Sequence, residues 1–245
     1  MKSSVVALST LFAPVCALAV SAAACKKEEA PAPAPAVAPT PAAPSAPPTP
    51  TAPPPAPTAG LPAPSELVGK PAPDFTLNDL DGAPVNLAAL RGKTVVLEWF
   101  NPKCPFVVAS HTKGSLVDAA KRHTEAGVVW LAINSGGPGK QGHELAHNVE
   151  GAKTFGLSHP ILRDEDGAVG KAYGATNTPN LFVIDGEGVV RYAGAVDNSP
   201  DGEAQSPEGG TLVRYVDAAL EDLAAGRPVA TPSTKPYGCS VKYAS

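Results

Sequence analysis

Residues Thr94–Cys104 read TVVLEWFNPKC, a strand pattern that leads directly into a cysteine. Its first seven positions are almost continuously apolar, which is typical of a central strand buried on both faces. Cys104 follows after a short loop, and Pro105 suits the first turn of a helix because its missing N–H costs little there. Unpaired backbone N–H groups and the helix dipole stabilise an anion at a helix start, so the sequence predicts a favoured Cys104 thiolate. Such a thiolate is what thiol–disulfide or peroxide chemistry requires. The alternatives are a buried structural cysteine and a purely stabilising disulfide.

Strand and helix patterns alternate on both sides of this stretch. Strands are expected at 75–77, 85–87, 94–100, 128–134, 180–184 and 189–193. Helices are expected at 105–126, 143–155, 168–173 and 211–225. The alternation predicts an α/β sandwich in which helices flank a central mixed sheet.

The N-terminal part of the chain has a different composition. Of the 29 prolines among 245 residues, 15 lie between Lys26 and Pro64, in a stretch built mainly of Ala, Pro, Thr and Ser. This stretch has no apolar periodicity, so we expect a disordered spacer. The sequence therefore divides into a signal peptide (1–24), a Pro/Ala-rich linker that starts at Cys25 (25–65) and a folded domain (66–245).

The leader indicates export from the cytoplasm. A short positive start, a mostly apolar run and small residues precede Cys25, which is the order of a secretory signal. Small residues directly before Cys25 also resemble a bacterial lipobox, although Ala22 stands where a leucine is usual. We expect lipidation at Cys25 and membrane attachment, facing the periplasm or cell surface. A free secreted form and an uncleaved anchor are the alternatives, and both are also extracytoplasmic.

Composition excludes several classes of protein. The formal net charge is −4 and the sequence has no cluster of basic residues, which argues against a nucleic-acid partner. Four cysteines in this length are too few for a disulfide-rich scaffold. With Cys16 in the leader and Cys25 at the lipid site, only Cys104 and Cys239 belong to the folded domain.

Several ordered motifs resemble the thioredoxin superfamily. Val96–Cys104 is similar to its strand with an internal acid, followed by a loop and a nucleophilic cysteine. Pro71–Phe75 (PAPDF) is similar to the opening of redoxin and alkyl-hydroperoxide-reductase-like domains, and Thr178-Pro179 resembles the cis-proline loop that faces the cysteine. The Asn-Pro-x-Cys-Pro-Phe-Val loop and the terminal Gly-Cys-Ser-x-Lys-Tyr are most similar to the peroxiredoxin-like branch. The resemblance runs from about residue 68 to residue 243 and implies a thioredoxin-like sandwich.

The resemblance also implies roles for individual residues. Cys104 matches the nucleophile, and Glu98 matches a buried acid that can relay a proton, although a merely paired carboxylate is an equal alternative. The second cysteine of the thioredoxin pair is replaced by Val107, so the resolving thiol must come from elsewhere. Cys239, in a polar tail beyond the last helix, is the candidate, and an unreacted tail thiol is the alternative. Asn101 stands where peroxiredoxins carry a threonine, which puts peroxidase activity in doubt.

Two histidine patterns are candidates for metal or catalytic sites. His143-Glu144-Leu145-Ala146-His147 satisfies the H-E-x-x-H pattern of zinc proteases but lacks the metzincin extension, so we expect an ordinary surface helix. His111 lies seven residues after Cys104, roughly 10 Å along a helix, too far for a direct hydrogen bond to the thiol. We expect no metal and no cofactor.

These observations together favour an extracytoplasmic thiol–disulfide oxidoreductase. Cys104 would attack a protein disulfide docked against Thr178-Pro179, Cys239 or an external thiol would release the product, and an unidentified thiol would reduce the pair. One alternative is a thiol peroxidase, in which Cys239 traps a sulfenic acid on Cys104. The other is a non-catalytic envelope binding module.

Overall fold

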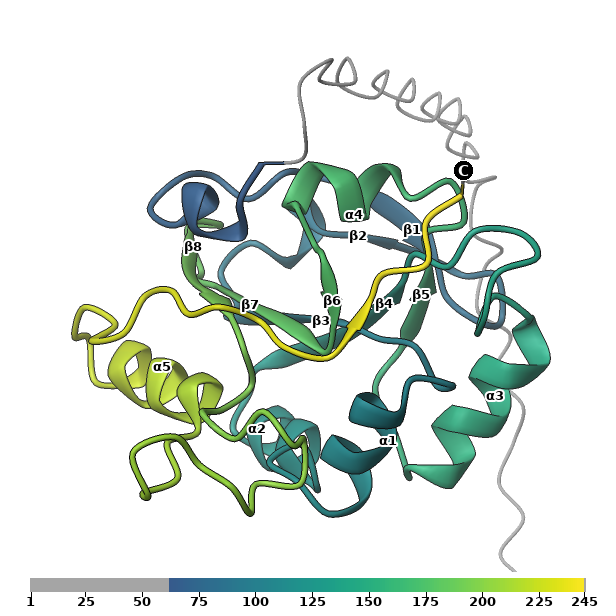
Figure 1. Cartoon of the computed structure of the whole chain (residues 1–245). Helices are drawn as coiled ribbons and strands as arrows, with labels where there is room; N and C mark the ends of the chain where they lie inside the picture. Colours follow the sequence, from purple (N-terminus) through teal and green to yellow (C-terminus); the bar gives the residue numbers. More distant parts are fainter. Residues whose placement is uncertain (1–61, 245) are drawn as a thin grey trace, which may run out of the picture. The chain divides into compact units, whose positions relative to one another are not determined.

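A mixed sheet runs through the part of the chain that the computed structural model describes, residues 62–244. Within that part it has seven strands in the order β2-β1-β5-β4-β3-β7-β8 (Figure 1). The strands are β1 (Thr76–Asn78), β2 (Pro84–Asn86), β3 (Val95–Trp99), β4 (Val129–Asn134), β5 (Ile161–Arg163), β7 (Asn180–Ile184) and β8 (Val190–Gly194). The expected signal peptide, Cys25 and most of the linker lie outside the described residues.

Strand β3 is central, as its apolar run predicts. It pairs in parallel with β4 and antiparallel with β7, and all five of its residues are buried. Because side chains alternate along a strand, Trp99 enters one side of the sheet while Glu98 enters the other. The carboxyl end of β3 delivers the chain to the loop that carries Cys104.

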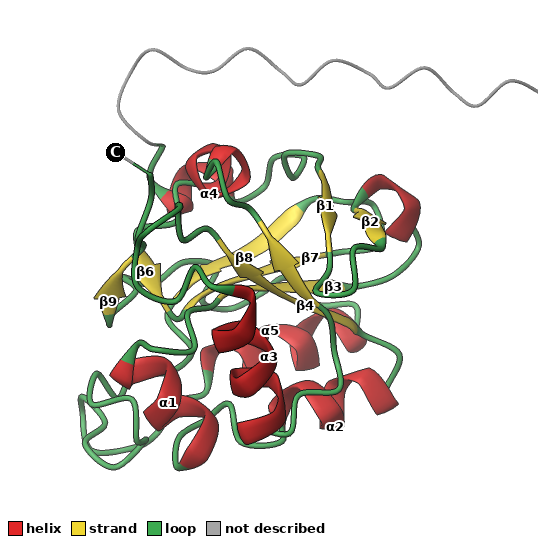
Figure 2. Cartoon of the chain, turned by 90° about the vertical axis from the view of Figure 1, so that its right-hand side faces the viewer, coloured by secondary structure: helices red, strands yellow, loops and turns green. Residues whose placement is uncertain are grey.

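Helices cover both faces of this sheet. Figure 2 shows α1 (Pro105–Thr112), α2 (Ala119–Glu125), α3 (Leu145–Thr154) and α5 (Tyr215–Ala224) on one face and α4 (Ala168–Tyr173) on the other. Trp99, Tyr173 and Phe182 pack together on the α4 face, with ring centroids 5.1–5.2 Å apart. Two short 3-10 helices, η1 (Pro64–Leu67) and η2 (Ala88–Leu90), lie near the start of the described chain. The arrangement confirms the predicted α/β sandwich with a central mixed sheet.

The prediction of a single helix at 105–126 is wrong, because the structure has two helices, α1 and α2, with a break between them. Residues 113–118 separate them, and a Cβ at Gly114 in this segment would overlap the carbonyl oxygen of Gly202. The Ser115 hydroxyl donates to the Asp197 carboxylate instead of continuing a helix, and Asp118 takes a left-handed conformation with φ of 53°. Contacts with the 197–214 loop therefore break a segment whose composition alone suits a helix.

Other boundaries also differ from the sequence expectations. Helix α3 begins at Leu145 instead of 143, and α5 begins at Tyr215 instead of 211. Strand β5 was not expected, nor was a separate two-stranded sheet in which β6 (Asn177–Thr178) pairs antiparallel with β9 (Cys239–Ser240). Strand β9 gives a defined place to the tail that the sequence presents only as polar. None of the helices within 62–244 combines the length and the apolar character that a membrane span requires.

Candidate active site around Cys104

Cys104 stands at the N-cap of α1, directly after the loop that leaves β3. Its N–H donates to the carbonyl oxygen of Asn101 at 3.0 Å, and its own carbonyl accepts from Val108 at 3.0 Å, the first hydrogen bond of the helix. Asn101 Oδ1 accepts from the Lys103 N–H at 2.9 Å, which fixes the turn between strand and helix. The local sequence therefore holds Cys104 at a helix start, although its side chain is fully buried.

The Thr178–Pro179 peptide lies against this cysteine. The Thr178–Pro179 bond is cis, in keeping with the loop that the sequence resembles. Cys104 Sγ donates to the carbonyl oxygen of Thr178 at 3.3 Å. The Thr178 hydroxyl is also buried, and within residues 62–244 it has no partner apart from the thiol. Two segments that are distant in sequence thus meet at one sulfur.

Cys239 reaches the same place from the C-terminal tail. In the pairing of β6 with β9, Cys239 stands opposite Thr178, and Figure 2 shows the two short strands side by side. Its side chain packs against the apolar cluster that contains Cys104, and each thiol shifts the pKa of the other. Both thiols are free, and Cys239 is the more exposed of the two.

The two thiols have opposite electrostatic environments. Burial by itself raises the pKa of Cys104, but hydrogen bonds from Cys239, Thr178 and the Val107 N–H outweigh it and lower the pKa below its ordinary value. Burial, a hydrogen bond to Cys104 and repulsion by its charge raise the pKa of Cys239 to about 11. Cys104 is therefore the member of the pair that ionises first, with Cys239 as its hydrogen-bond donor.

Glu98 is buried on β3 beneath the helices and makes its hydrogen bonds away from the cysteines. His111 Nε2 lies 2.7 Å from Glu98 Oε1, and Trp130 Nε1 donates to Oε2 at 3.0 Å. Burial opposes ionisation, but His111, His159 and Trp130 together lower the pKa of Glu98. Glu98 is thus an ionised, paired carboxylate, and none of the hydrogen bonds found for it within 62–244 goes to Cys104.

The H-E-x-x-H residues do not share a helix face. His143 precedes α3 and its Nδ1 lies 2.9 Å from the Gly136 carbonyl, while Glu144 is the N-cap of the helix. Only His147 is inside the helix. Within residues 62–244, no group of three His, Cys, Asp or Glu side chains is placed to hold a metal ion.

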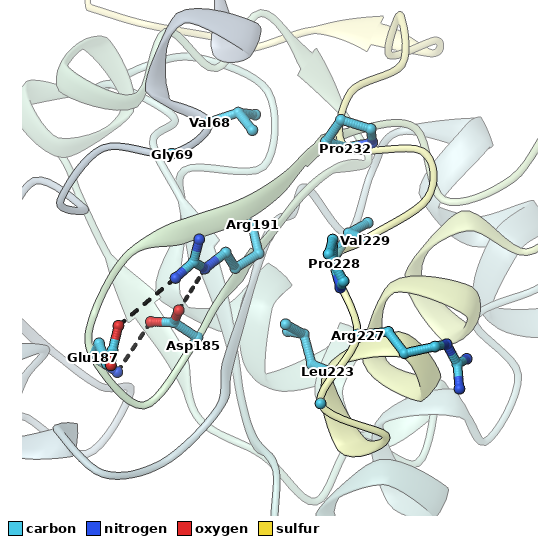
Figure 3. Close-up of a pocket in the computed structure, with 11 residues that line it drawn as sticks. Val68, Gly69, Asp185, Glu187, Arg191, Leu223, Arg227, Pro228, Val229 and Pro232 are labelled. Atoms are coloured by element: carbon cyan, nitrogen blue, oxygen red, sulfur yellow. Dashed lines mark hydrogen bonds and ion pairs between the residues drawn. The ribbon is translucent and has the colours of Figure 1, made fainter.

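A surface hollow of about 620 Å³ lies elsewhere in the domain (Figure 3). Asp185, Glu187 and Arg191 form an ion-pair group on one side of it, and Leu223 and Arg227 approach from the end of α5. Neither cysteine lines this hollow, so it is separate from the candidate active site.

Sequence reasoning missed two features of the site. The Thr178 hydroxyl contributes to lowering the pKa of Cys104, whereas the sequence indicated Thr178 only as part of the cis-proline loop on which the substrate docks. Gly238 takes a φ of 100°, and a Cβ there would overlap the Thr178 carbonyl, so only glycine lets the tail come this close. Gly238, next to Cys239, was the one residue in the sequence that could have indicated this close approach of the tail to Thr178.

Comparisons with curated proteins link this geometry to thiol chemistry. The thiol-disulfide oxidoreductase ResA of Geobacillus thermodenitrificans is 35% identical over 119 residues, which make up 48% of this chain and 63% of that protein. Chloroplastic peroxiredoxin Q of Triticum aestivum is 29% identical over 126 residues, 49% of this chain and 54% of that protein. The chain thus spans less than two thirds of the length of these relatives.

Solved structures and a family profile cover more of the chain. An uncharacterized conserved protein from Geobacillus kaustophilus is 33% identical, with a TM-score of 0.61, over 72% of this chain and 92% of that one. A hypothetical protein from Sinorhizobium meliloti 1021 is 28% identical, with a TM-score of 0.62, over 73% of this chain and 95% of that one. The Redoxin profile matches residues 67–209, more than half of the chain. With a cysteine at a helix start facing a cis-proline loop, the chain belongs to the Redoxin family of the thioredoxin superfamily.

Proposed function

We propose that this protein is an extracytoplasmic thiol–disulfide oxidoreductase in which Cys104 is the nucleophile and Cys239 the resolving cysteine. The observation that carries the proposal is the position of Cys239 opposite Thr178, because this pairing places its thiol against Cys104. The relatives with a thiol–disulfide oxidoreductase name support the same chemistry. An external thiol would be the reductant.

The first step is the attack of the Cys104 thiolate on a substrate disulfide. A bond forms between Cys104 Sγ and one substrate sulfur, the substrate S–S bond breaks, and the other sulfur leaves as a thiolate. Once Cys104 is bound in the mixed disulfide it carries no charge. The negative charge on Cys104 and its hydrogen bond from the Cys239 thiol both raise the pKa of Cys239, and both are lost in the mixed disulfide. The resolving thiol therefore becomes easier to ionise when it is needed.

The second step returns the substrate as a dithiol. The Cys239 thiolate attacks Cys104 Sγ, the mixed disulfide breaks, and the released substrate sulfur takes up a proton. The substrate disulfide has gained two electrons, and the two cysteines have lost them in forming the Cys104–Cys239 bond. Two equivalents of a reducing thiol, or one dithiol, then reduce the Cys104–Cys239 bond and are themselves oxidised to a disulfide, which closes the cycle.

Glu98 supports this site indirectly in our proposal. Its hydrogen bonds to His111 and Trp130 tie α1 to the sheet, so the start of that helix keeps its position. These contacts favour the paired-carboxylate alternative over a proton relay. Pro179 and Thr178 form the wall against which the substrate sulfur docks.

A thiol peroxidase is the second candidate function. Cys104 is fully buried beside a resolving thiol already in place, an arrangement that a small hydroperoxide could use, and peroxiredoxin Q is among the relatives. The Cys104 thiolate would take one peroxide oxygen as a sulfenic acid and release an alcohol or water, and Cys239 would then form the disulfide and release water. Asn101 in place of the peroxiredoxin threonine argues against this function.

Three proteins separate these possibilities: the wild type, Cys104→Ser and Cys239→Ser. Mass spectrometry after mild oxidation and alkylation should show a Cys104–Cys239 disulfide in the wild type only. Cys239→Ser should accumulate mixed disulfides with a model protein disulfide, and Cys104→Ser should form none. Peroxide consumption by the wild type at a rate comparable to disulfide exchange would favour the peroxidase. Two thiols that stay free in every condition would leave the binding module as the better interpretation.

The location outside the cytoplasm rests on the sequence of the leader. The charged start, apolar run and small residues before Cys25 support export and lipid attachment, with the linker to residue 65 as a spacer. An oxidising compartment permits the Cys104–Cys239 disulfide. The proposed partners are therefore disulfide or thiol proteins of that compartment, a thiol reductant and a membrane.

A further inference from the structure

The C-terminal segment Tyr237–Tyr243, called the strap below, lies across the candidate active site. Figure 1 shows it in yellow, running over the end of the sheet past β6. Backbone hydrogen bonds hold it along its length: the Val241 N–H donates to the Thr176 carbonyl at 3.0 Å, and the Gly137 N–H donates to the Lys242 carbonyl at 2.8 Å. The strap is therefore bound as an extended peptide and not only through its cysteine.

A tyrosine fixes the strap on each side of Cys239. The Tyr237 hydroxyl donates to Asp197 Oδ1 at 2.8 Å, before the cysteine. After it, the Tyr243 hydroxyl donates to the Ala175 carbonyl at 2.7 Å. The Tyr243 ring lies so close to α4 that a Cβ at Gly170 would be 2.5 Å from its hydroxyl oxygen. These anchors set where the resolving thiol sits.

The strap occupies the strand edge that an extended substrate would need. An unpaired strand edge binds peptides by adding a strand, and the edge of β6 lies directly before Pro179 and beside Cys104. That edge is already paired with β9, in the register Thr178 with Cys239 and Asn177 with Ser240. With the strap in place Cys104 is fully buried, so every reagent needs some movement of the strap to reach the sulfur. A peptide that binds by strand addition needs the larger movement, because the strap must also leave the β6 edge.

We infer that the strap, held by Tyr237 and Tyr243, selects substrates by size. A small disulfide or oxidant reaches Cys104 through a local opening beside Cys239 that leaves the β6–β9 pairing intact, whereas a peptide disulfide reacts only in the fraction of molecules whose strap has left β6. Tyr237 and Tyr243 are then positioning residues that determine specificity. This inference rests on the proposed role of Cys104 as nucleophile.

Two probes with the same leaving group test it. One is methyl 2-pyridyl disulfide, and the other is a short extended peptide whose cysteine carries the same 2-pyridyl disulfide. The Cys104 thiolate attacks the probe sulfur and forms a mixed disulfide, and the pyridine-2-thiolate that leaves is measured by absorbance. All proteins carry Cys239→Ser, so the pyridine-2-thiolate released from the folded domain measures the reaction of Cys104 alone.

Tyr243→Ala weakens one anchor, and Gly238→Ala pushes the strap from β6 while keeping both tyrosines. Either change shifts the docked strap toward release, and we expect the peptide probe to react about tenfold faster while the methyl probe changes by less than about threefold. Tyr173→Phe is the matched control, because it also loses a buried hydroxyl-to-carbonyl hydrogen bond, to Pro73 at 2.8 Å, but not in the strap. It should leave the ratio of the two rates unchanged. Tyr243→Phe, which keeps the ring, should give a rate ratio between those of the parent Cys239→Ser protein and Tyr243→Ala.

The outcomes distinguish this inference from the proposed function. If Cys104 reacts with both probes and neither Tyr243→Ala nor Gly238→Ala changes the ratio, the strap does not select by size and the inference is wrong. Equal acceleration of both probes would also overturn it, because the strap would then shield Cys104 from every reagent alike. If neither probe reacts with any variant, the role of Cys104 itself fails.

Discussion

His159 should make the folding stability depend on pH between neutrality and about pH 4. It lies in the loop that joins α3 to β5, its side chain is buried against Trp130, and neither ring nitrogen has a hydrogen-bond partner within the described chain. Burial disfavours the imidazolium and is the largest effect, Glu98 opposes it, and His111 adds to it. The result is a pKa lowered to about 4 from an ordinary value of 6.5.

The direction of the effect follows from proton binding. Above pH 6.5 His159 is neutral in both the folded and the unfolded chain, so its titration contributes nothing. Between pH 6.5 and 4 the unfolded chain binds a proton that the folded chain does not, and the free energy of unfolding falls as the pH falls. A difference of about 2.5 pKa units corresponds to about 3 kcal/mol over this range.

Urea unfolding of the wild type and of His159→Phe at several pH values between 7 and 4 measures this contribution. The phenylalanine keeps an apolar ring and cannot titrate, so the variant should gain about 3 kcal/mol relative to the wild type between pH 7 and pH 4. Glu98, whose pKa is lowered, makes both proteins lose stability as the pH falls through its own range, so that loss largely cancels in the comparison. His147→Phe, measured in parallel, reports the effect of the same substitution outside this cluster. Parallel curves for the wild type and His159→Phe would refute the reasoning.

Three further results are expected. Thr178→Val removes a hydroxyl that helps to lower the pKa of Cys104, so the pH profile of Cys104 alkylation should move to higher pH, and an unchanged profile would contradict this role. Glu98→Gln removes the charge of a buried, hydrogen-bonded carboxylate and should cost about 3 kcal/mol in urea unfolding, whereas the exposed Glu150→Gln should leave the free energy of unfolding almost unchanged, and equal losses would count against a structural role for the Glu98 charge. Cys25→Ser should release the protein from the membrane fraction of a bacterial host, and wild-type protein that is wholly soluble with an unmodified cysteine would disprove lipidation.

The sequence could predict the central sheet and the place of Cys104, but not the partners of the buried polar groups. The run before Phe100 identifies β3 because a short, continuous apolar segment is stable only where both of its faces are buried, and Pro105 marks the helix start. Strands β6 and β9 have two residues each, which is too short for any periodic pattern. The contact of His111 with Glu98 joins a helix to a strand, and spacing along one helix does not reveal it.

The pairing of β6 with β9 also bears on how sequences of this family can vary. Because side chains alternate along a strand, a slip of one residue would turn Cys239 away from Cys104, so the Gly238-Cys239 step cannot shift relative to Thr178. The connection from the end of α5 to the strap carries no such constraint, since loop length changes cost little. Related chains should therefore keep a glycine–cysteine step near their C-terminus while its distance from the last helix drifts. An alignment that forces fixed spacing would miss the proposed resolving cysteine.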